Sequence, residues 1–137
     1  MPTTTRRQFL DKGAKAAIAG TAIFASANSP KKKQMENIFI HHVYFWLNNP
    51  GSIADRDKLV EGLTKLSKVI LLQQFHIGKP AGTNRDVIEN TYAISWFTIF
   101  ANAANQASYQ TDPIHLKFVE EYKYLWKKVI VYDSIDL

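Results

Sequence analysis

The sequence predicts an α+β domain with an antiparallel sheet, whose elements follow the order strand, helix, strand, strand, helix, strand. Three observations support this class. Residues 38–47 and 91–100 alternate as half-buried strands do, and residues 52–70 and 112–126 repeat apolar side chains every three or four positions, as amphipathic helices do. A last run, residues 127–132, is rich in β-branched residues and predicts a final strand.

The first strand is predicted at residues 38–47, and the Asn-Asn-Pro-Gly turn at 48–51 ends it. Successive side chains of a strand point to opposite faces of the sheet. One face therefore carries His42, Tyr44 and Trp46, and the other carries His41, Val43, Phe45 and Leu47. Both faces are apolar enough for a central strand.

The first helix is predicted to begin at Ser52, which forms a capping box with Asp55. Its apolar stripe follows at helical spacing: Leu59, Leu63, Leu66 and Ile70. A second strand is predicted at residues 73–77, ended by the glycines and proline of residues 78–82.

The third strand is predicted at residues 91–100, and its alternation places five side chains on one face: Tyr92, Ile94, Trp96, Thr98 and Phe100. A helical region begins at residues 101–107 and leads to Asp112, a good N-cap, and Pro113, which suits the first helical position. The second main stripe is Ile114, Phe118, Tyr122 and either Leu125 or Trp126.

Two split βαβ units in this order form the ferredoxin-like plait, an antiparallel sheet with its helices on one face. The other face is predicted to carry large aromatic side chains: Trp46 or Phe45, Tyr92 and Trp96. These side chains are too apolar for a solvated surface. We therefore expect the same face of a second copy to cover them, which gives a homodimer with a barrel-like centre.

The N-terminus resembles a twin-arginine export signal. Arg6 and Arg7 precede Phe9 and Leu10, an Ala-rich apolar run spans residues 14–25, and Ala25-Ser26-Ala27 offers a cleavage site. The expected organisation is a signal at residues 1–27, a linker at 28–37 and a folded domain at 38–137. This predicts a periplasmic protein without a stable membrane anchor after signal removal; a chain started at Met35 would be cytoplasmic.

Charge and composition narrow the class of partner. The net charge is +5, and residues 1–27 account for three of these charges, so the rest of the chain is close to neutral. This argues against nucleic acid as a partner. The chain has no cysteine, which excludes disulfides, thiolate metal sites and a cysteine nucleophile.

His115 is the leading candidate for chemistry, since it lies in the first turn of a capped helix. The positive end of the helix dipole disfavours imidazolium there, so a neutral imidazole could act as a base. Tyr109 lies six residues earlier and could share a pocket with it. The alternatives are that His115 packs beside the cap and that Tyr109 packs under the helix entrance.

His41 and His42 are further candidates. They are adjacent on a strand, so only one of them can face a pocket shared with His115. No group of residues has the spacing of metal ligands, and we expect neither a metal nor another cofactor.

Five segments together resemble the stress-responsive dimeric α/β-barrel family, over about residues 38–134. They are His41–Leu47, Phe75–Gly78, Tyr92–Ser95, Tyr109–Phe118 and Leu125–Asp133. The resemblance implies a ferredoxin-like fold, homodimerisation through the sheets, and an apolar cavity between the sheet and the helices.

A plant polyketide cyclase of this family uses a histidine and a tyrosine for an aldol-type ring closure. The resemblance matches these residues to His115 and Tyr109, and a first-strand histidine to His41 or His42. The family enzyme's third-strand histidine falls near Ala93 or Ile94 and is absent here, as is a first-helix tyrosine near Leu63 or Thr64.

Three functions remain open. The first is cofactor-free cyclase or lyase chemistry on a small apolar or carbonyl-containing molecule, with His115 as base and Tyr109 as donor to an enolate oxygen. The second is a ligand-binding or stress-related homodimer without catalysis. The third is a monooxygenase like other branches of the superfamily.

Overall fold

The structure is a computed structural model that describes residues 29–137, and the signal predicted at residues 1–27 lies outside this range. Residues 29–38 form neither helix nor strand. Within the described range, no helix is long and apolar enough to cross a membrane.

The described domain contains four strands and three α-helices, with one short 3-10 turn. In chain order they are β1 (Phe39–Leu47), α1 (Ile53–Leu66), β2 (Gln74–Gly78), β3 (Ile94–Phe100), α2 (Ala103–Gln110), α3 (Pro113–Tyr122), η1 (Lys123–Leu125) and β4 (Trp126–Ile135).

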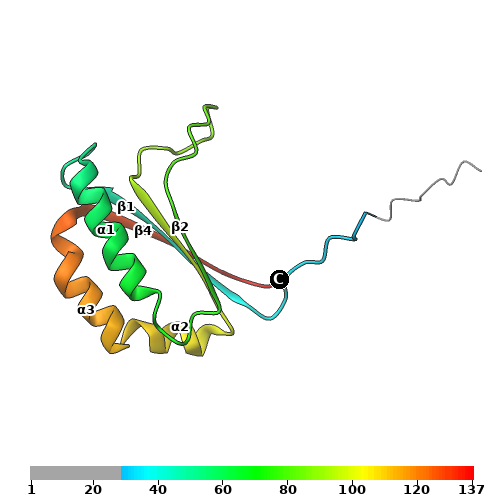
Figure 1. The fold of residues 1–137 in the computed structure, drawn as a ribbon. Coiled ribbons are helices and arrows are strands. Elements are labelled where there is room, and N and C mark those ends of the chain that lie inside the picture. The colour runs from blue at the N-terminus through cyan, green and yellow to red at the C-terminus, as the bar shows by residue number, and fades with distance from the viewer. Residues whose placement is uncertain (1–28) are drawn as a thin grey trace, which may run out of the picture. The chain divides into compact units, whose positions relative to one another are not determined.

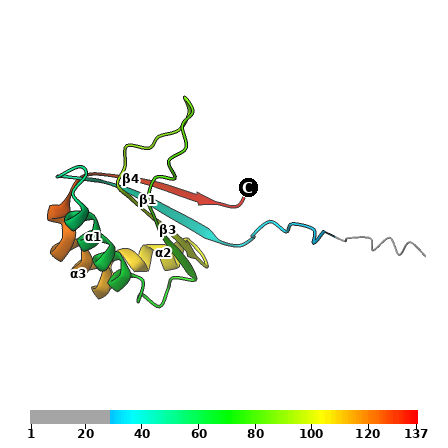
Figure 2. The same ribbon diagram turned by 45° about the horizontal axis from the view of Figure 1, so that its top comes forward.

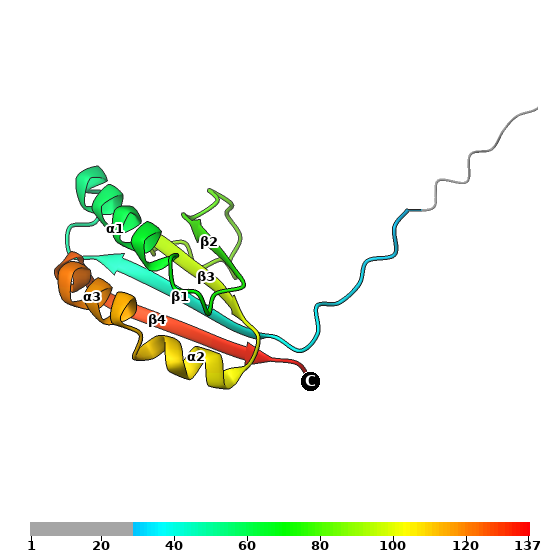
Figure 3. The ribbon, with the colours of Figure 1, turned by 60° about the horizontal axis from the view of Figure 1, so that its bottom comes forward.

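The four strands form one antiparallel sheet in the order β2-β3-β1-β4. The helices lie on one side of this sheet, as Figures 1 and 3 show. This is the predicted ferredoxin-like plait. We call the side of the sheet that faces the helices the helix face, and the other side the open face.

The second predicted helix is two helices, α2 and α3, with a break at Thr111 and Asp112. Asp112 caps α3, because its Oδ1 accepts a hydrogen bond of 2.8 Å from the Ile114 amide. Pro113 has no N–H to donate, so it starts α3 and cannot continue α2. The cap of α1 is also as predicted, since Ser52 Oγ accepts from the Asp55 amide.

The hydrophobic core lies between the helix face and the helices. From α1 it takes Leu59, Leu63 and Leu66, and from the sheet it takes Val43, Phe45, Leu47, Ile94, Trp96 and Phe100. Two predicted stripe members are outside it. Ile70 is 93% exposed because α1 ends at Leu66, and Ile114 is exposed on the first turn of α3.

Trp96 corrects the predicted division of the sheet faces. It is 1% exposed within the core, on the helix face, and not among the aromatics of the open face. β3 begins at Ile94 and not at residue 91, so Tyr92 belongs to the long connection that precedes it. This connection, residues 79–93, extends beyond the sheet in Figure 2.

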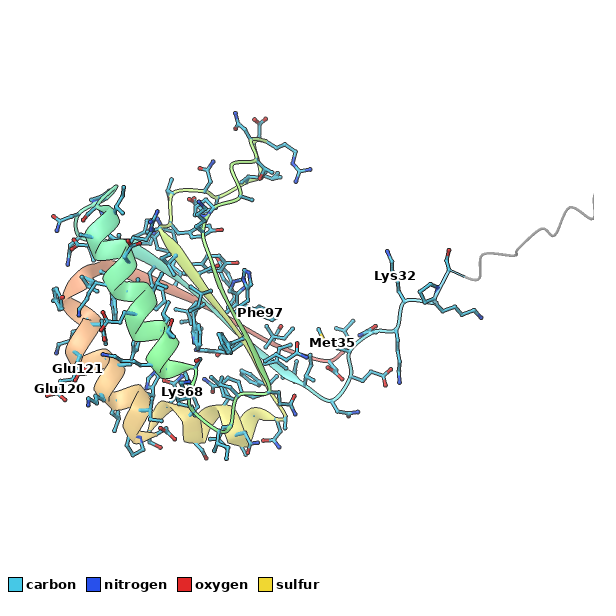
Figure 4. The ribbon with its side chains drawn as sticks, viewed as in Figure 1. Lys32, Met35, Lys68, Phe97, Glu120 and Glu121 are labelled. Atoms are coloured by element: carbon cyan, nitrogen blue, oxygen red, sulfur yellow. The ribbon has the colours of Figure 1, made fainter. Side chains whose placement is uncertain are left out.

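The open face has the aromatic character that was predicted for it. Tyr44 contacts both Tyr92 and Tyr132 edge to face, with ring centroids 4.9 and 5.9 Å apart. Trp46 also contacts Tyr92. In Figure 4, Phe97 of β3 projects from the side of the sheet that is turned away from the helices.

Candidate active site

A cavity of about 140 Å³ lies between the helix face and the helices α2 and α3. Three of the sequence-predicted residues line it: His41 from β1, Tyr109 from α2 and His115 from α3. Besides Gln110, apolar side chains form the rest of its wall, including Trp96, Phe118 and Val131. Polar groups that converge in a small apolar cavity are the usual mark of a binding or active site.

His41 is almost fully buried and is held by a carboxylate. Its Nδ1 lies 2.6 Å from Oδ1 of Asp133, and its exposed fraction is 5%. The two residues are direct partners in the pairing of β1 with β4, so the sheet itself sets this contact. Because a carboxylate accepts, Nδ1 carries the proton and donates it to Asp133. The amide of Gln106 lies 3.4 Å from the same nitrogen.

His115 is oriented by the end of α2. Its Nδ1 lies 3.1 Å from the carbonyl oxygen of Gln110. A carbonyl oxygen can only accept, so Nδ1 carries the proton of the neutral ring and Nε2 keeps a lone pair. Burial lowers the pKa of His115, and the neighbouring His41 lowers it further, against an opposing contribution from the Gln110 hydrogen bond. His115 is therefore a neutral base at neutral pH.

Tyr109 lies between the two histidines. Its ring centroid is 4.6 Å from that of His115 and 5.9 Å from that of His41. The indole Nε1 of Trp96 donates to its hydroxyl oxygen over 3.2 Å. Burial raises the pKa of Tyr109 despite this hydrogen bond, so the side chain stays a phenol with its own proton free to donate.

His42 does not join this cavity. It follows His41 directly on β1, and the alternation of the strand places its ring on the open face, where it contacts Tyr44 and Phe97. Of the two first-strand candidates, His41 is the one that lines the cavity.

Sequence reasoning missed two supporting residues: Asp133 and Trp96. The sequence alone assigns no role to Asp133, because its partner His41 can be recognised only once the register of β1 and β4 is known. Trp96 had been placed on the opposite face of the sheet. Within residues 29–137, no group of three or more His, Asp or Glu side chains could hold a metal ion.

Four other hollows of the described domain are larger, and two of them exceed the rest in volume. One, of about 430 Å³ between α1 and α3, is bordered by Lys65, Lys68 and Lys117. The other, of about 480 Å³, lies on the open face beside Trp46 and Tyr132. Neither contains a histidine, whereas the smaller cavity combines two histidines with a buried tyrosine. We therefore take the smaller cavity as the candidate active site.

Solved structures with this fold have different functions. One is a hydroxynitrile lyase from Passiflora edulis, which is 16% identical in sequence and has a TM-score of 0.63. The aligned region covers 75% of this chain and 96% of the lyase chain. Another is a dimeric ferredoxin-like protein of unknown function from Thermobifida fusca, which is 14% identical in sequence and has a TM-score of 0.61. The aligned region covers 76% of this chain and 95% of that protein's chain.

A third similar structure, from Nitrosomonas europaea, is assigned provisionally as an antibiotic biosynthesis monooxygenase. It is 10% identical, covers 77% of this chain and 96% of its own, and has a TM-score of 0.58. No curated protein sequence matches the chain. At these identities the structures show the fold alone. The family model of the stress-responsive A/B barrel domain matches residues 39–136, and the chain belongs to this family.

Proposed function

We propose that the protein catalyses a cofactor-free lyase or cyclase reaction, in which a proton is transferred and a bond is made or broken beside the carbonyl group of a small molecule. The observation that carries the proposal is the shared cavity of His115 and Tyr109, which provides a neutral base next to a protonated phenol. Such a pair is what proton abstraction beside a carbonyl requires.

His115 acts as the general base through Nε2, since Nδ1 is held by the Gln110 carbonyl. Tyr109 donates a hydrogen bond to the oxygen on which negative charge develops. His41, fixed by Asp133, provides a second imidazole in the wall and orients the substrate.

In the cleavage direction, Nε2 of His115 takes the hydroxyl proton of a β-hydroxy carbonyl compound or a cyanohydrin. The electrons of the O–H bond form the new C=O bond, and the adjacent C–C bond breaks. The leaving enolate or cyanide then takes the proton back from His115, so the base is restored. In the reverse direction, the same groups close an aldol-type bond.

The size of the cavity limits the substrate. An engineered protein cavity of about 150 Å³ accommodates benzene. The cavity here is of similar size, about 140 Å³, and its wall is mostly apolar. We infer a compact substrate of about one ring. A protein with the same fold that is described as a hydroxynitrile lyase supports this reaction class.

We further propose that two copies associate through their open faces. The support is the aromatic surface of this face, which includes Tyr44, Trp46, Tyr92 and Tyr132, together with the dimeric state of a protein with the same fold. An exposed apolar surface of this kind favours association with a complementary copy. We also propose export, on the support of the Arg6-Arg7 motif.

The experiment is a screen of small carbonyl compounds and cyanohydrins, followed by NMR in D₂O for solvent-deuterium uptake and C–C cleavage. His115→Ala should lower turnover of the best substrate at least about 100-fold, as loss of a general base does. Tyr109→Phe should lower kcat more than it changes KM, because its hydrogen bond strengthens in the transition state.

Two exposed residues provide matched controls. Lys117→Ala changes a charge on α3, and Tyr124→Phe removes an exposed hydroxyl group, so neither should affect turnover. Turnover that survives both His115→Ala and Tyr109→Phe unchanged would rule out the proposed site. A ligand that binds this cavity with no turnover in any assay would instead favour the ligand-binding function.

A further inference from the structure

Two histidines lie in one row across the open face. His42 of β1 and His76 of β2 both pair with Phe97 of β3, one on either side, and Tyr132 of β4 pairs with His42 at the other end of the row. Residues that pair across strands in this way point to the same face of a sheet. The row is separate from the candidate active site, which lies on the helix face.

His42 has an incomplete hydrogen-bond environment. Its ring lies 4.4 Å from the ring of Tyr44 and 5.2 Å from that of Phe97, and its Nδ1 is 3.1 Å from the Tyr44 hydroxyl oxygen. Its Nε2 is buried and has no hydrogen-bond partner within the described residues. In a protonated ring both nitrogens carry a proton, and the N–H donor at Nε2 would have no acceptor. Protonation would also place a positive charge at this site.

The groups around His42 offer this charge no partner. On β1 the neighbours are Tyr44 on the same face and His41 on the other, on β2 there is His76, and on β4 there is Tyr132. Phe97 of β3 carries no charge. Asp133, which follows Tyr132 on β4, binds His41 on the helix face, and Glu89, which borders the open-face hollow with Tyr44, binds Thr91.

We propose that the open-face dimer closes only while His42 is neutral, so that acidification separates the two copies. This rests on the proposed homodimer, whose interface would enclose the histidines of both copies. Burial already lowers the pKa of His42 in the single chain, and His76 and His41 lower it further. A second copy removes more water from the His42 ring and brings another pair of imidazoles to the same surface.

Linkage gives the direction and size of the effect. The dimer binds protons at His42 less readily than the separated chains do, so every proton taken up favours dissociation. For each histidine that gains a proton on separation, the dissociation constant rises up to about tenfold per pH unit below the pKa of the free chain. With one His42 from each copy, the rise is up to about 100-fold per pH unit.

The test is analytical ultracentrifugation of the full chain over a concentration series between pH 8.0 and 5.0, with circular dichroism at each pH to verify that the fold is intact. We expect a dimer at pH 8.0 and a dissociation constant that rises toward pH 5.0, by up to about 100-fold for each pH unit below the pKa of His42 in the free chain. His42→Gln and His42→Phe remove the titrating group, and both should give a much flatter pH dependence.

His115→Asn is the matched control, because it removes a histidine from the helix face and should leave the pH dependence of dimerisation as in the wild type. A wild-type dissociation constant that is equal at pH 8.0 and 5.0 would overturn the inference, as would an equally steep dependence in both His42 variants. A chain that is monomeric at every pH would instead refute the homodimer itself, and the inference with it.

Discussion

At the scale of single residues, Gly62 shows how closely α1 and α3 pack. A methyl group added at this glycine would lie 2.8 Å from carbons of the Tyr122 ring. That ring has little freedom to move, because its hydroxyl bonds to Glu61 and Lys65 and its face stacks on Phe118. Glycine is thus needed here for a close approach and not for an unusual backbone conformation.

Gly62→Ala should therefore destabilise the fold although alanine is the better helix former. Overpacking costs about 1–3 kcal/mol, and the gain in helix propensity is about 1 kcal/mol. We expect a net loss of about 1 kcal/mol in the free energy of unfolding, measured by urea denaturation. Thr64→Ala, at an exposed position of the same helix, is the control and should change stability by less than about 0.5 kcal/mol. Equal or greater stability of Gly62→Ala would contradict the close packing.

The residue scale also shows what sequence could and could not predict about the site. His115 and its position in a capped first turn followed from Asp112 and Pro113, which act on their immediate neighbours. Asp133 could not be assigned to His41, because 92 positions separate them and only the pairing of β1 with β4 brings them together. His115 was found because its signal is local, and Asp133 was missed because its signal depends on strand register.

At the scale of elements, the break between α2 and α3 positions the candidate active site. The cap at Asp112 starts α3 at an angle to α2, as Figure 1 shows, and places His115 against the last carbonyl group of α2. Sequence predicted this cap and a helical region that leads to it from residues 101–107, but counted both as one helix of the fold. The apolar pattern indicates which face of a helix is buried, while the cap indicates where a new helix begins.

Asp112→Ala should weaken both the helix and the site. Loss of an N-cap costs about 1 kcal/mol, which should appear as a lower midpoint of urea unfolding. With the first turn of α3 less ordered, His115 should be held less firmly by the Gln110 carbonyl, and turnover of any substrate found should fall. Asp112→Asn keeps an accepting oxygen and should stay close to the wild type in both measurements. Equal effects of the two substitutions would show that the charge of Asp112 matters and not its capping hydrogen bond.

At the scale of the whole domain, the sheet separates two groups of histidines. His41 and His115 lie on the helix face around the cavity, and His42 and His76 lie on the open face. The order of strands and helices was predictable from the sequence because each element carries its own pattern. The side of the sheet on which Trp96 lies was not predicted correctly, because the predicted strand included Tyr92, which lies before the start of β3.

Since His42 and His115 each lie on a different face of the sheet and are partly buried there, we expect the folded domain to lose stability in mild acid. The pKa values of His42 and His115 both lie below the ordinary value of 6.5, so each binds its proton less readily in the folded chain than in the unfolded one. Their contribution is fully present above about pH 6.5 and is lost as the pH falls toward the lowered pKa values. Each can contribute up to about 1.4 kcal/mol per pH unit within that window.

Urea unfolding at pH 7.5, 6.0 and 5.0, at a protein concentration low enough to keep the chain monomeric, should show this decline. Glu61 does not interfere, because Lys65 and Lys58 hold its pKa at about 2 and it stays ionised throughout. His115→Asn and His42→Gln should each remove part of the slope, and the double variant should remove most of it. A wild-type free energy of unfolding that stays constant from pH 7.5 to 5.0 would show that neither histidine is held neutral by the fold, and would remove the physical basis for a neutral base at His115.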